Sequence, residues 1–286
     1  MRTKKNVALK NYTTFKIGGP AKYFCIVKTE KDLLQAVKWA NKNNLPFFIL
    51  GGGSNLLVAD KGFNGLVIKI ENCKLKIVNS KVIAGAGISL TTLLSVTANA
   101  GLSGLEWSAG IPGATLGGAI RGNAGAFETG IKDVVRKVEV FDVRDLRFKI
   151  YDLRDCQFGY RESVFKKNSN LIIFSAELEF KKSDKKKIKE KVKEILSYRM
   201  SKHPKLPSAG SVFKNLENIR ARDLIEKAGL KGKKIGRAQI SDQHANFIVN
   251  LGGAKAKDVL ELMNLAKKEV KNKLGIKIEE EIQILS

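Results

Sequence analysis

Two glycine-rich segments carry the residue types most able to bind a ligand through the backbone. The first has the sequence GGGSN at residues 51–55 and follows the apolar run 45–50, which is typical of a buried strand. Backbone N–H groups without side chains around them can form an anion-binding nest for a phosphate. The segment leads into another apolar run and lacks a Gly-Lys-Ser/Thr ending, so it is neither a Rossmann fingerprint nor a Walker loop. Taken alone, it would indicate only a tight turn.

A second and longer glycine-rich segment occupies residues 110–125, with the sequence GIPGATLGGAIRGNAG, and Trp107 lies just upstream. Two backbone-lined segments in one domain suit a large planar ligand with a pyrophosphate better than they suit two ordinary turns. A flavin dinucleotide fits this description. The two segments together therefore predict an FAD site, in which the backbone approaches the cofactor too closely for side chains.

The elements that must position these segments follow from hydrophobic spacing and capping residues. Residues 21–27 are predicted as a strand, followed by a helix that begins after Thr29 with Asp32 in a capping box; with strand 45–50 they form a β-α-β unit. Ser89 is predicted to cap a second helix that ends at Gly101 in a left-handed conformation. Further strands are predicted at residues 65–70, 75–78, 81–84, 134–143, 146–151 and 171–180.

The composition changes abruptly to Lys and Glu after residue 180, and this predicts a domain boundary just before a helix that contains Ile188 and Arg199. The Lys-rich run 181–187 is predicted to start or precede that exposed helix. A helix at 222–228 ended by Gly229, a strand at 246–250, a helix at 256–274 ended by Gly275 and a strand at 276–284 are predicted to follow. Helices and strands mixed in this way indicate an α+β fold.

Composition restricts the class of protein. With 286 residues and 43% hydrophobic content the chain can form a folded core, and no apolar run reaches the roughly 18 residues of a membrane helix. The three cysteines lie far apart and there are only two histidines, so we expect neither a disulfide framework nor a metal site. The N-terminus lacks the apolar stretch of a signal peptide. We therefore expect a reduced, cytoplasmic protein with no membrane partner.

The formal net charge of +24 permits nucleic acid, an anionic membrane surface or a small anionic ligand as a partner. The Lys residues are spread over the whole length, and the aromatic residues that stack on bases make up only 7% of the chain. A Lys-rich solvated surface explains this pattern better than a nucleic-acid site, so we expect no nucleic-acid partner. A basic nucleic-acid-binding protein is the rival interpretation, but it gives the two glycine-rich segments no role.

Six stretches of the sequence form a recognisable pattern. They are Asn11–Ala21, Gly51–Asn55, Gly110–Gly125, Phe158–Ser163, Pro207–Asn215 and Glu279–Ile282. In these stretches and in their order, the chain resembles the UDP-N-acetylenolpyruvoylglucosamine reductases (the MurB family). Matches in all six, from near one end of the chain to the other, argue against coincidence.

The resemblance implies a flavoenzyme that reduces UDP-N-acetylglucosamine enolpyruvate to UDP-N-acetylmuramate in peptidoglycan synthesis. NADPH would reduce the FAD, and the flavin would pass a hydride to the enolpyruvyl group. The implied fold is an FAD-binding domain of the p-cresol methylhydroxylase/vanillyl-alcohol oxidase type, with lobes at residues 1–72 and 73–184, and an α+β substrate-binding domain at 185–286. The expected partners are the UDP-sugar and NADPH, bound by a monomer. Another oxidoreductase of the same flavin fold is the alternative within enzymes.

The resemblance also assigns ligand-binding residues. Tyr160, Lys202 and Asn215 fall on substrate-contacting positions. Gln283 stands where some members have an arginine, so that contact is not carried over. The short interval between residues 161 and 211 indicates the subclass without a long, tyrosine-bearing insertion. The positions expected to hold FAD are Gly51, Gly52, Gly53, Ser54, Asn55, Leu56, Gly110, Ile111, Pro112, Gly113, Gly117, Gly118, Ala119, Asn123, Ala124 and Gly125.

Arg161, Ser211 and Glu281 fall on the catalytic positions of the family, and the reaction explains why these residue types are suitable. Hydride addition to the terminal enolpyruvyl carbon leaves an enolate, which Arg161 can stabilise because its guanidinium stays charged and forks onto a carboxylate. Ser211 can then donate a proton to the enolate carbon. Glu281 would act with Arg161 on the enol, as a protonated acid if it is buried. Without the resemblance all three would be interpreted as structural, and His244 keeps that interpretation, as a hydrogen-bonded residue before a buried strand.

Overall fold

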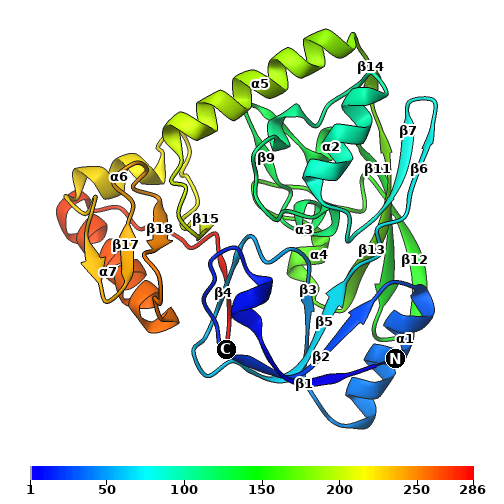
Figure 1. Ribbon diagram of the computed structural model, residues 1–286, viewed down its shortest axis with the longest axis horizontal. Coiled ribbons are helices and arrows are strands. Elements are labelled where there is room, and N and C mark those ends of the chain that lie inside the picture. The colour runs from blue at the N-terminus through cyan, green and yellow to red at the C-terminus, as the bar shows by residue number, and fades with distance from the viewer. Residues whose placement is uncertain (1) are drawn as a thin grey trace. The chain divides into compact units, whose positions relative to one another are not determined.

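The computed structural model describes residues 2–286 and divides them into two compact units (Figure 1). The first unit comprises residues 2–4, 23–52 and 65–198, and the second comprises residues 5–22, 53–64 and 199–286. Each unit has its own hydrophobic core, one containing Leu66 and Phe141 and the other containing Phe15 and Phe213. The second unit thus takes in two segments from the N-terminal part of the chain. The division into domains 1–72, 73–184 and 185–286 stays a prediction.

The first sheet has the strand order β1-β2-β5-β3. The helix that follows β2 begins as predicted, because the Thr29 hydroxyl accepts a hydrogen bond from Asp32 N (3.1 Å) and Thr29 N donates to the Asp32 carboxylate (3.0 Å). The predicted β-α-β unit is present, but β5 is inserted between β2 and β3 and pairs in parallel with β3. The elements concerned are β1 Lys4–Ala8, β2 Pro20–Val27, α1 Glu30–Lys42, β3 Phe47–Leu50 and β5 Phe63–Ile70.

A larger antiparallel sheet of the order β12-β11-β13-β7-β6 belongs to the first unit. Its strands are β6 Leu75–Val78, β7 Lys81–Gly85, β11 Val135–Asp142, β12 Arg147–Asp152 and β13 Leu171–Glu179. The first four residues of β13 are all buried, and the short helix α3 (Leu116–Arg121) packs against β13 and β7. The five strands predicted for this region of the sequence are confirmed.

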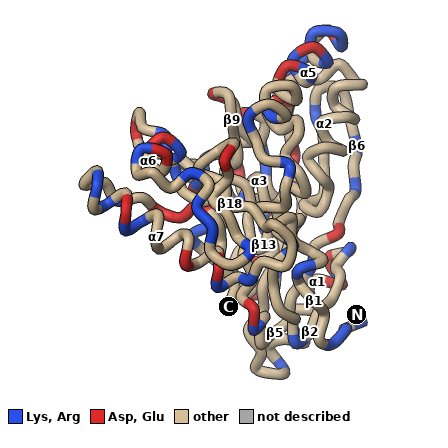
Figure 2. The backbone as a smooth tube through the Cα atoms, turned by 60° about the vertical axis from the view of Figure 1, so that its left-hand side comes forward, with Lys and Arg blue, Asp and Glu red and all other residues tan. Residues whose placement is uncertain are grey.

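The predicted helix starts and ends of the first unit are also confirmed. α2 (Leu90–Asn99) begins after Ser89, whose hydroxyl accepts from Thr92 N (2.9 Å), and it is followed by Gly101 at φ +71°. α5 (Lys185–Lys202) starts in the Lys-rich run, and its last four residues belong to the second unit. Figure 2 shows Lys and Arg distributed over much of the chain, with acidic residues among them on α5. The minor elements are β8 Leu102–Ser103, η2 Glu106–Ser108, β9 Gly125–Ala126, β10 Thr129–Gly130, η3 Ile131–Asp133, α4 Val164–Lys167 and β14 Lys181–Lys182.

The second unit contains a four-stranded antiparallel sheet of the order β15-β18-β17-β16, with α7 packed on β16 and β17. Its elements are η1 Leu9–Tyr12, β15 Ser208–Ser211, α6 Ala221–Lys227, β16 Lys234–Ile235, β17 Ala238–Ile240, β18 Phe247–Asn250 and α7 Ala256–Leu274. The Asp60 carboxylate caps α7 by accepting from Ala256 N (2.8 Å) and Lys257 N (3.1 Å). α7 ends at Gly275, which has φ +72° as predicted.

The C-terminal segment differs from the prediction of one strand at 276–284. The structure has only the short strand β19 (Gln283–Leu285), which pairs in parallel with β4 (Leu56–Val58). Residues 279–281 instead lie along residues 212–214, with Lys214 N donating to Glu279 O (2.9 Å). The segment thus changes partner within a few residues, and its apolar pattern does not reveal this. None of the helices in residues 2–286 is long and apolar enough to cross a membrane.

Candidate active site

The two glycine-rich segments contact each other through their backbones in the first unit. A Cβ atom built on Gly52 would overlap the carbonyl oxygen of Gly113, and one built on Gly51 would lie 2.6 Å from the Thr115 hydroxyl oxygen. Glycine is therefore required at residue 52 by the fold itself, whatever binds there. The assignment of Gly52 to the FAD site stays a prediction.

Several small residues of the second segment are exposed. Gly110, Pro112, Gly113 and Gly118 are all exposed, and a Cβ atom built on Gly118 would meet only the Thr115 hydroxyl oxygen, at 3.4 Å. Peptide groups that are exposed and not covered by side chains can approach a ligand closely. One added side-chain atom at Gly118 would thus meet little of the protein itself, and the assignment of residues 110–118 to the FAD site stays a prediction.

The glycine-rich segment 110–125 is hydrogen-bonded to the turn that carries Arg161. Three hydrogen bonds join them: Asn123 Nδ2 to Gly159 O (2.7 Å), Arg161 Nη1 to Gly125 O (3.1 Å) and Ser163 Oγ to Arg121 O (2.7 Å). Ser163 also starts α4, since its hydroxyl accepts from Lys166 N at 3.2 Å. The predicted catalytic arginine and the predicted cofactor segment thus form one rigid, hydrogen-bonded group in the first unit.

Arg161 adopts a backbone conformation that is rare for a residue with a side chain. Its φ is +55°, in the left-handed region, and its carbonyl oxygen accepts a hydrogen bond from Lys166 Nζ at 2.8 Å. Its guanidinium carbon lies 5.5 Å from the centre of the Tyr160 ring, and Tyr160 is 55% exposed. Strained conformations of this kind are concentrated at functional sites, where neighbouring contacts hold them. The hydrogen bonds of Arg161 Nη1 and of the Arg161 carbonyl oxygen hold the residue in this conformation.

Arg121 is a cation in the same segment that the sequence assignment did not single out. Burial lowers the pKa of its guanidinium, and the negative charge of Glu162 partly opposes that shift. Arginine remains charged even so. A half-buried positive charge in a glycine-rich segment is suited to an anionic group of a ligand. The sequence already contained an indication of this residue, because Arg121 is the single charged residue of segment 110–125.

Ser211 and Glu281 are brought together by the second unit. Ser211 ends β15, directly after Gly210 at φ +78°, and the next residue, Val212, accepts a hydrogen bond from Glu281 N through its carbonyl oxygen (2.7 Å). Phe213 forms an isolated bridge with Glu280. Two residues predicted to be catalytic therefore lie on adjacent, hydrogen-bonded segments, although 69 positions separate them in the sequence.

The end of the first glycine-rich segment lies against the same group. The Asn55 side-chain amide donates to Glu281 O (3.1 Å), and Gln283 N donates to Asn55 O (3.0 Å). Leu56 continues this contact in the parallel pair of β4 with β19. Gly53 has φ +66°, and its carbonyl oxygen accepts from Thr14 N (3.2 Å). The positions Gly53 to Leu56 thus belong to the second unit together with Ser211 and Glu281.

Comparison with known proteins decides which family this geometry represents. Residues 202–285 match the model of the UDP-N-acetylenolpyruvoylglucosamine reductase C-terminal domain, and residues 21–145 match that of an FAD binding domain. The UDP-N-acetylenolpyruvoylglucosamine reductase of Alkaliphilus oremlandii is 43% identical over 97% of this chain and 91% of its own length. The corresponding reductase of Caldanaerobacter subterraneus is 41% identical over 98% of this chain and 92% of its own length. This chain belongs to the UDP-N-acetylenolpyruvoylglucosamine reductase family.

A solved structure of the family agrees with the sequence comparison. The crystal structure of UDP-N-acetylenolpyruvylglucosamine reductase from Thermus caldophilus matches with a TM-score of 0.86 and 39% identity, over the full length of both chains. The predicted α+β fold, with an FAD-binding domain and the C-terminal domain of this reductase family, is confirmed. The prediction of an FAD-dependent oxidoreductase is confirmed with it. The roles of individual residues stay predictions.

The predicted substrate-contacting residues of this reductase family member are distributed over both units. Lys202 is the exposed last residue of α5, and Asn215 is exposed, with its side-chain oxygen accepting a hydrogen bond from Ala221 N (3.0 Å). Both belong to the second unit, whereas Tyr160 belongs to the first. Their contact with a substrate stays a prediction.

His244 does not match the expectation of a fully hydrogen-bonded structural residue. Its backbone N donates to the Ser241 hydroxyl (3.2 Å), but its Nδ1 atom is buried with no hydrogen-bond partner among the described residues. Its ring contacts those of His203 and Phe247, with centroids 5.5 and 4.8 Å away. Burial lowers the pKa of both histidines to about 4, and the positive charge of Arg222 acts in the same direction. Both imidazoles are therefore neutral at neutral pH.

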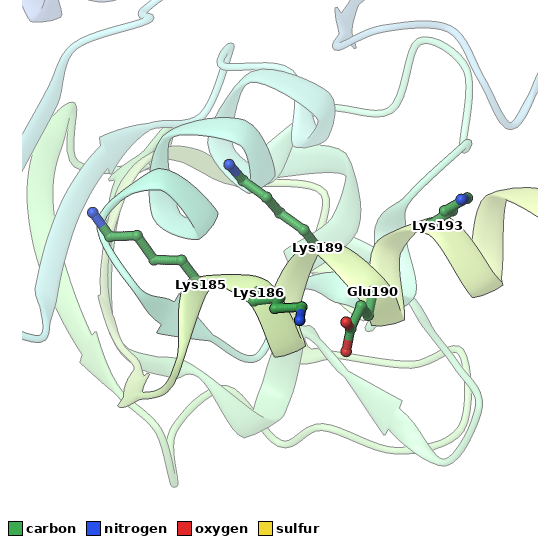
Figure 3. Close-up of a pocket in the computed structure, with 5 residues that line it drawn as sticks. All are labelled: Lys185, Lys186, Lys189, Glu190 and Lys193. Atoms are coloured by element: carbon green, nitrogen blue, oxygen red, sulfur yellow. The ribbon is translucent and has the colours of Figure 1, made fainter.

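A depression of about 480 Å³ along α5 contains none of the predicted site residues. It is lined by Lys185, Lys186, Lys189, Glu190 and Lys193, whose side chains extend in different directions from the helix (Figure 3). Side chains that diverge in this way do not converge on a common ligand atom. The depression is a feature of a Lys-rich helix surface and not of the candidate active site.

Proposed function

We propose that this chain reduces the enolpyruvyl ether of UDP-N-acetylenolpyruvoylglucosamine to UDP-N-acetylmuramate with NADPH, as a step of peptidoglycan synthesis. The observation that carries the proposal is the hydrogen-bonded arrangement of the Ser211 and Glu281 segments in the second unit, because this reaction needs a proton donor for the enolate carbon and a second group that acts on the enol. The curated relatives that bear the name of this reductase support the same substrate.

FAD would be held by the glycine-rich segment 110–125, in which Gly110, Gly113 and Gly118 are exposed, together with residues 51–56. When bound, the flavin accepts a hydride from NADPH and supplies it to the terminal carbon of the enolpyruvyl group. Arg121 would lie near an anionic part of a ligand, because it is the cation of that segment.

Arg161 would stabilise the enolate that hydride addition leaves on the substrate. The negative charge of this enolate spreads onto the adjacent carboxylate, and a guanidinium can donate two parallel hydrogen bonds to it. The hydrogen bond from Arg161 Nη1 to Gly125 O fixes the side chain beside the cofactor segment. Orientation of this kind is what a preorganised electrostatic site requires.

Ser211 would donate the proton that completes the reduction, from its hydroxyl group to the enolate carbon. Glu281 would act on the enol together with Arg161. Tyr160, Lys202 and Asn215 would contact the UDP-sugar, whose diphosphate needs cationic and hydrogen-bonding groups. We further propose that the enzyme works as a cytoplasmic monomer on these small molecules, without a nucleic-acid partner.

The replacement Ser211→Ala tests this proposal, because the reaction divides into two halves with different needs. Reduction of FAD by NADPH uses no proton donor at the enolpyruvyl carbon, whereas reoxidation by the substrate does. We expect the first half to keep its rate within about twofold and the second to slow by at least about a hundredfold, the lower contribution of a positioned general acid. Stopped-flow absorbance of the flavin measures both.

Ser208→Ala is the matched control, since Ser208 starts the strand that Ser211 ends. The control should leave both halves near their wild-type rates. If Ser211→Ala slows both halves equally, Ser211 supports the fold or the flavin position, and if it slows neither, another group delivers the proton. Either result contradicts the proposed role of Ser211.

A further inference from the structure

On the side that faces β18, the backbone that follows Ser211 is held in part by a side chain. β15 pairs with β18, with Ser211 opposite Phe247, and the pairing is irregular between Ser208 and Ser211. Upstream of Phe247 the chain turns away, with Phe247 N donating to His244 O (2.9 Å). Residues 212 and 213 therefore extend past the start of β18 on this side, while residues 279–281 lie along their other side.

Asn246 fills this gap. Its carbonyl oxygen accepts from Val212 N (2.8 Å), its side-chain oxygen accepts from Phe213 N (2.9 Å), and its side-chain amide donates to Phe213 O (2.8 Å). A carboxamide offers one acceptor and donors in the same plane, as a peptide group does. The Asn246 side chain thus extends the sheet by one residue pair at the position where the main chain has turned away.

The contacts of Asn246 are buried and belong to the segment next to the proposed proton donor. Asn246 is 3% exposed and Phe213 is 2% exposed, so water does not replace a hydrogen bond that is lost there. On the opposite side of this segment, the Val212 carbonyl oxygen accepts a hydrogen bond from Glu281 N (2.7 Å). The backbone just after Ser211 is therefore held between Asn246 and the Glu281 segment.

We propose that Asn246 is a positioning residue for the protonation step, one that holds Ser211 at the enolate carbon through the backbone of Val212 and Phe213. This inference rests on the proposed function of Ser211 and goes beyond it, since Asn246 is buried and would act only through the backbone of Val212 and Phe213. Displacement of a reacting group by about 1 Å can cost about a hundredfold in rate. A role in positioning predicts a defect confined to the half-reaction that needs Ser211.

The structure provides a matched control in Asn250, at the other end of β18. Asn250 is 4% exposed, and its side chain donates to Phe15 O (3.0 Å) and accepts from Gly252 N (2.9 Å) and Ala254 N (3.0 Å). It is thus an equally buried asparagine with comparable hydrogen bonds, but they stabilise other segments. Asn250→Ala should lower thermal stability as Asn246→Ala does, without a preference for one half-reaction.

The experiment measures both half-reactions by stopped-flow absorbance in FAD-loaded enzyme. For Asn246→Ala we expect reoxidation by substrate to slow about 10- to 100-fold and reduction by NADPH to stay within about twofold. If this variant does not fold, Asn246→Ser, which keeps a hydroxyl in the site, takes its place with the same expectation. Equal slowing of FAD reduction and FAD reoxidation in Asn246→Ala would overturn the proposal. So would Asn250→Ala if it slowed reoxidation relative to reduction by the same factor as Asn246→Ala.

A double variant separates this inference from the proposed function. If Asn246 acts through Ser211, the variant Ser211→Ala/Asn246→Ala should reoxidise no more slowly than Ser211→Ala alone, whereas independent effects would multiply. If the rate losses of the two single variants multiply in the double variant, Asn246 does not act through Ser211. If Ser211→Ala leaves reoxidation intact, the proposed role of Ser211 fails and the positioning role fails with it. If Ser211→Ala is slow and Asn246→Ala is not, only the positioning role fails.

Discussion

Replacing Gly118 by valine should weaken FAD binding without unfolding the protein. Gly118 lies in α3 and is exposed, and a Cβ atom on it meets only the Thr115 hydroxyl oxygen, at 3.4 Å. The protein by itself therefore has room for a side chain at this position. A loss of FAD in this variant would show that the cofactor occupies the space in front of Gly118.

The size of each effect follows from the local structure. Valine is better than glycine in a helix by a few tenths of a kcal/mol, so the free energy of unfolding of the apoprotein should change by less than about 0.5 kcal/mol. A side chain forced against a packed group costs about 1–3 kcal/mol. Since 1.4 kcal/mol is tenfold in affinity, we expect the Kd for FAD to rise about 5- to 150-fold.

The assay measures the affinity for FAD and the stability of the apoprotein in the same preparation. Flavin content follows from the absorbance of the purified protein, the Kd from titration of apoprotein with FAD, and stability from thermal unfolding without FAD. Gly52→Val is the contrasting variant, since a Cβ at Gly52 overlaps the Gly113 carbonyl oxygen, and it should destabilise the apoprotein itself. If Gly118→Val folds like the wild type and binds FAD with an unchanged Kd, residues 110–125 do not hold the cofactor as assigned.

Two further predictions concern Arg161 and the histidine pair. The variant Arg161→Lys keeps the positive charge but loses the two parallel hydrogen-bond donors of the guanidinium. Its turnover should therefore fall about a hundredfold with FAD content unchanged. Turnover at the wild-type rate would show that forked hydrogen bonding is not needed. Burial lowers the folded-state pKa of His203 and His244 to about 4, so the unfolded chain binds more protons as the pH falls below 6.5. The free energy of unfolding should therefore be at its full value above pH 6.5 and decrease from pH 6.5 to about 4. Urea unfolding measured from pH 6.5 to 4 should show that the free energy of unfolding depends less on pH in the variant His203→Gln/His244→Gln than in the wild type. An equally steep pH dependence in the variant would show that these two histidines do not cause the loss of stability.

Much of the secondary structure could be predicted because its signals are local. The capping box of Thr29 and Asp32, the Ser89 cap and the left-handed Gly101 and Gly275 act on backbone groups within a few residues of themselves. The alternating apolar strands of the large sheet are of the same kind. The six family stretches likewise lie in the sequence as continuous motifs, which is why the family and its FAD domain could be predicted and were confirmed.

The tertiary structure decided which strands and segments are neighbours. The insertion of β5 between β2 and β3, and the division of 276–284 between residues 212–214 and β4, depend on backbone hydrogen bonds that any sequence can make. For the same reason the hydrogen bonds of Asn246 to Phe213 could not be predicted, since an asparagine before a buried strand usually caps or turns. Local spacing thus determined where the helices begin and end, and the family motifs indicated what chemistry the chain can do. Long-range backbone pairing, which leaves no mark on composition or periodicity, decided that Ser211, Asn246 and Glu281 lie together.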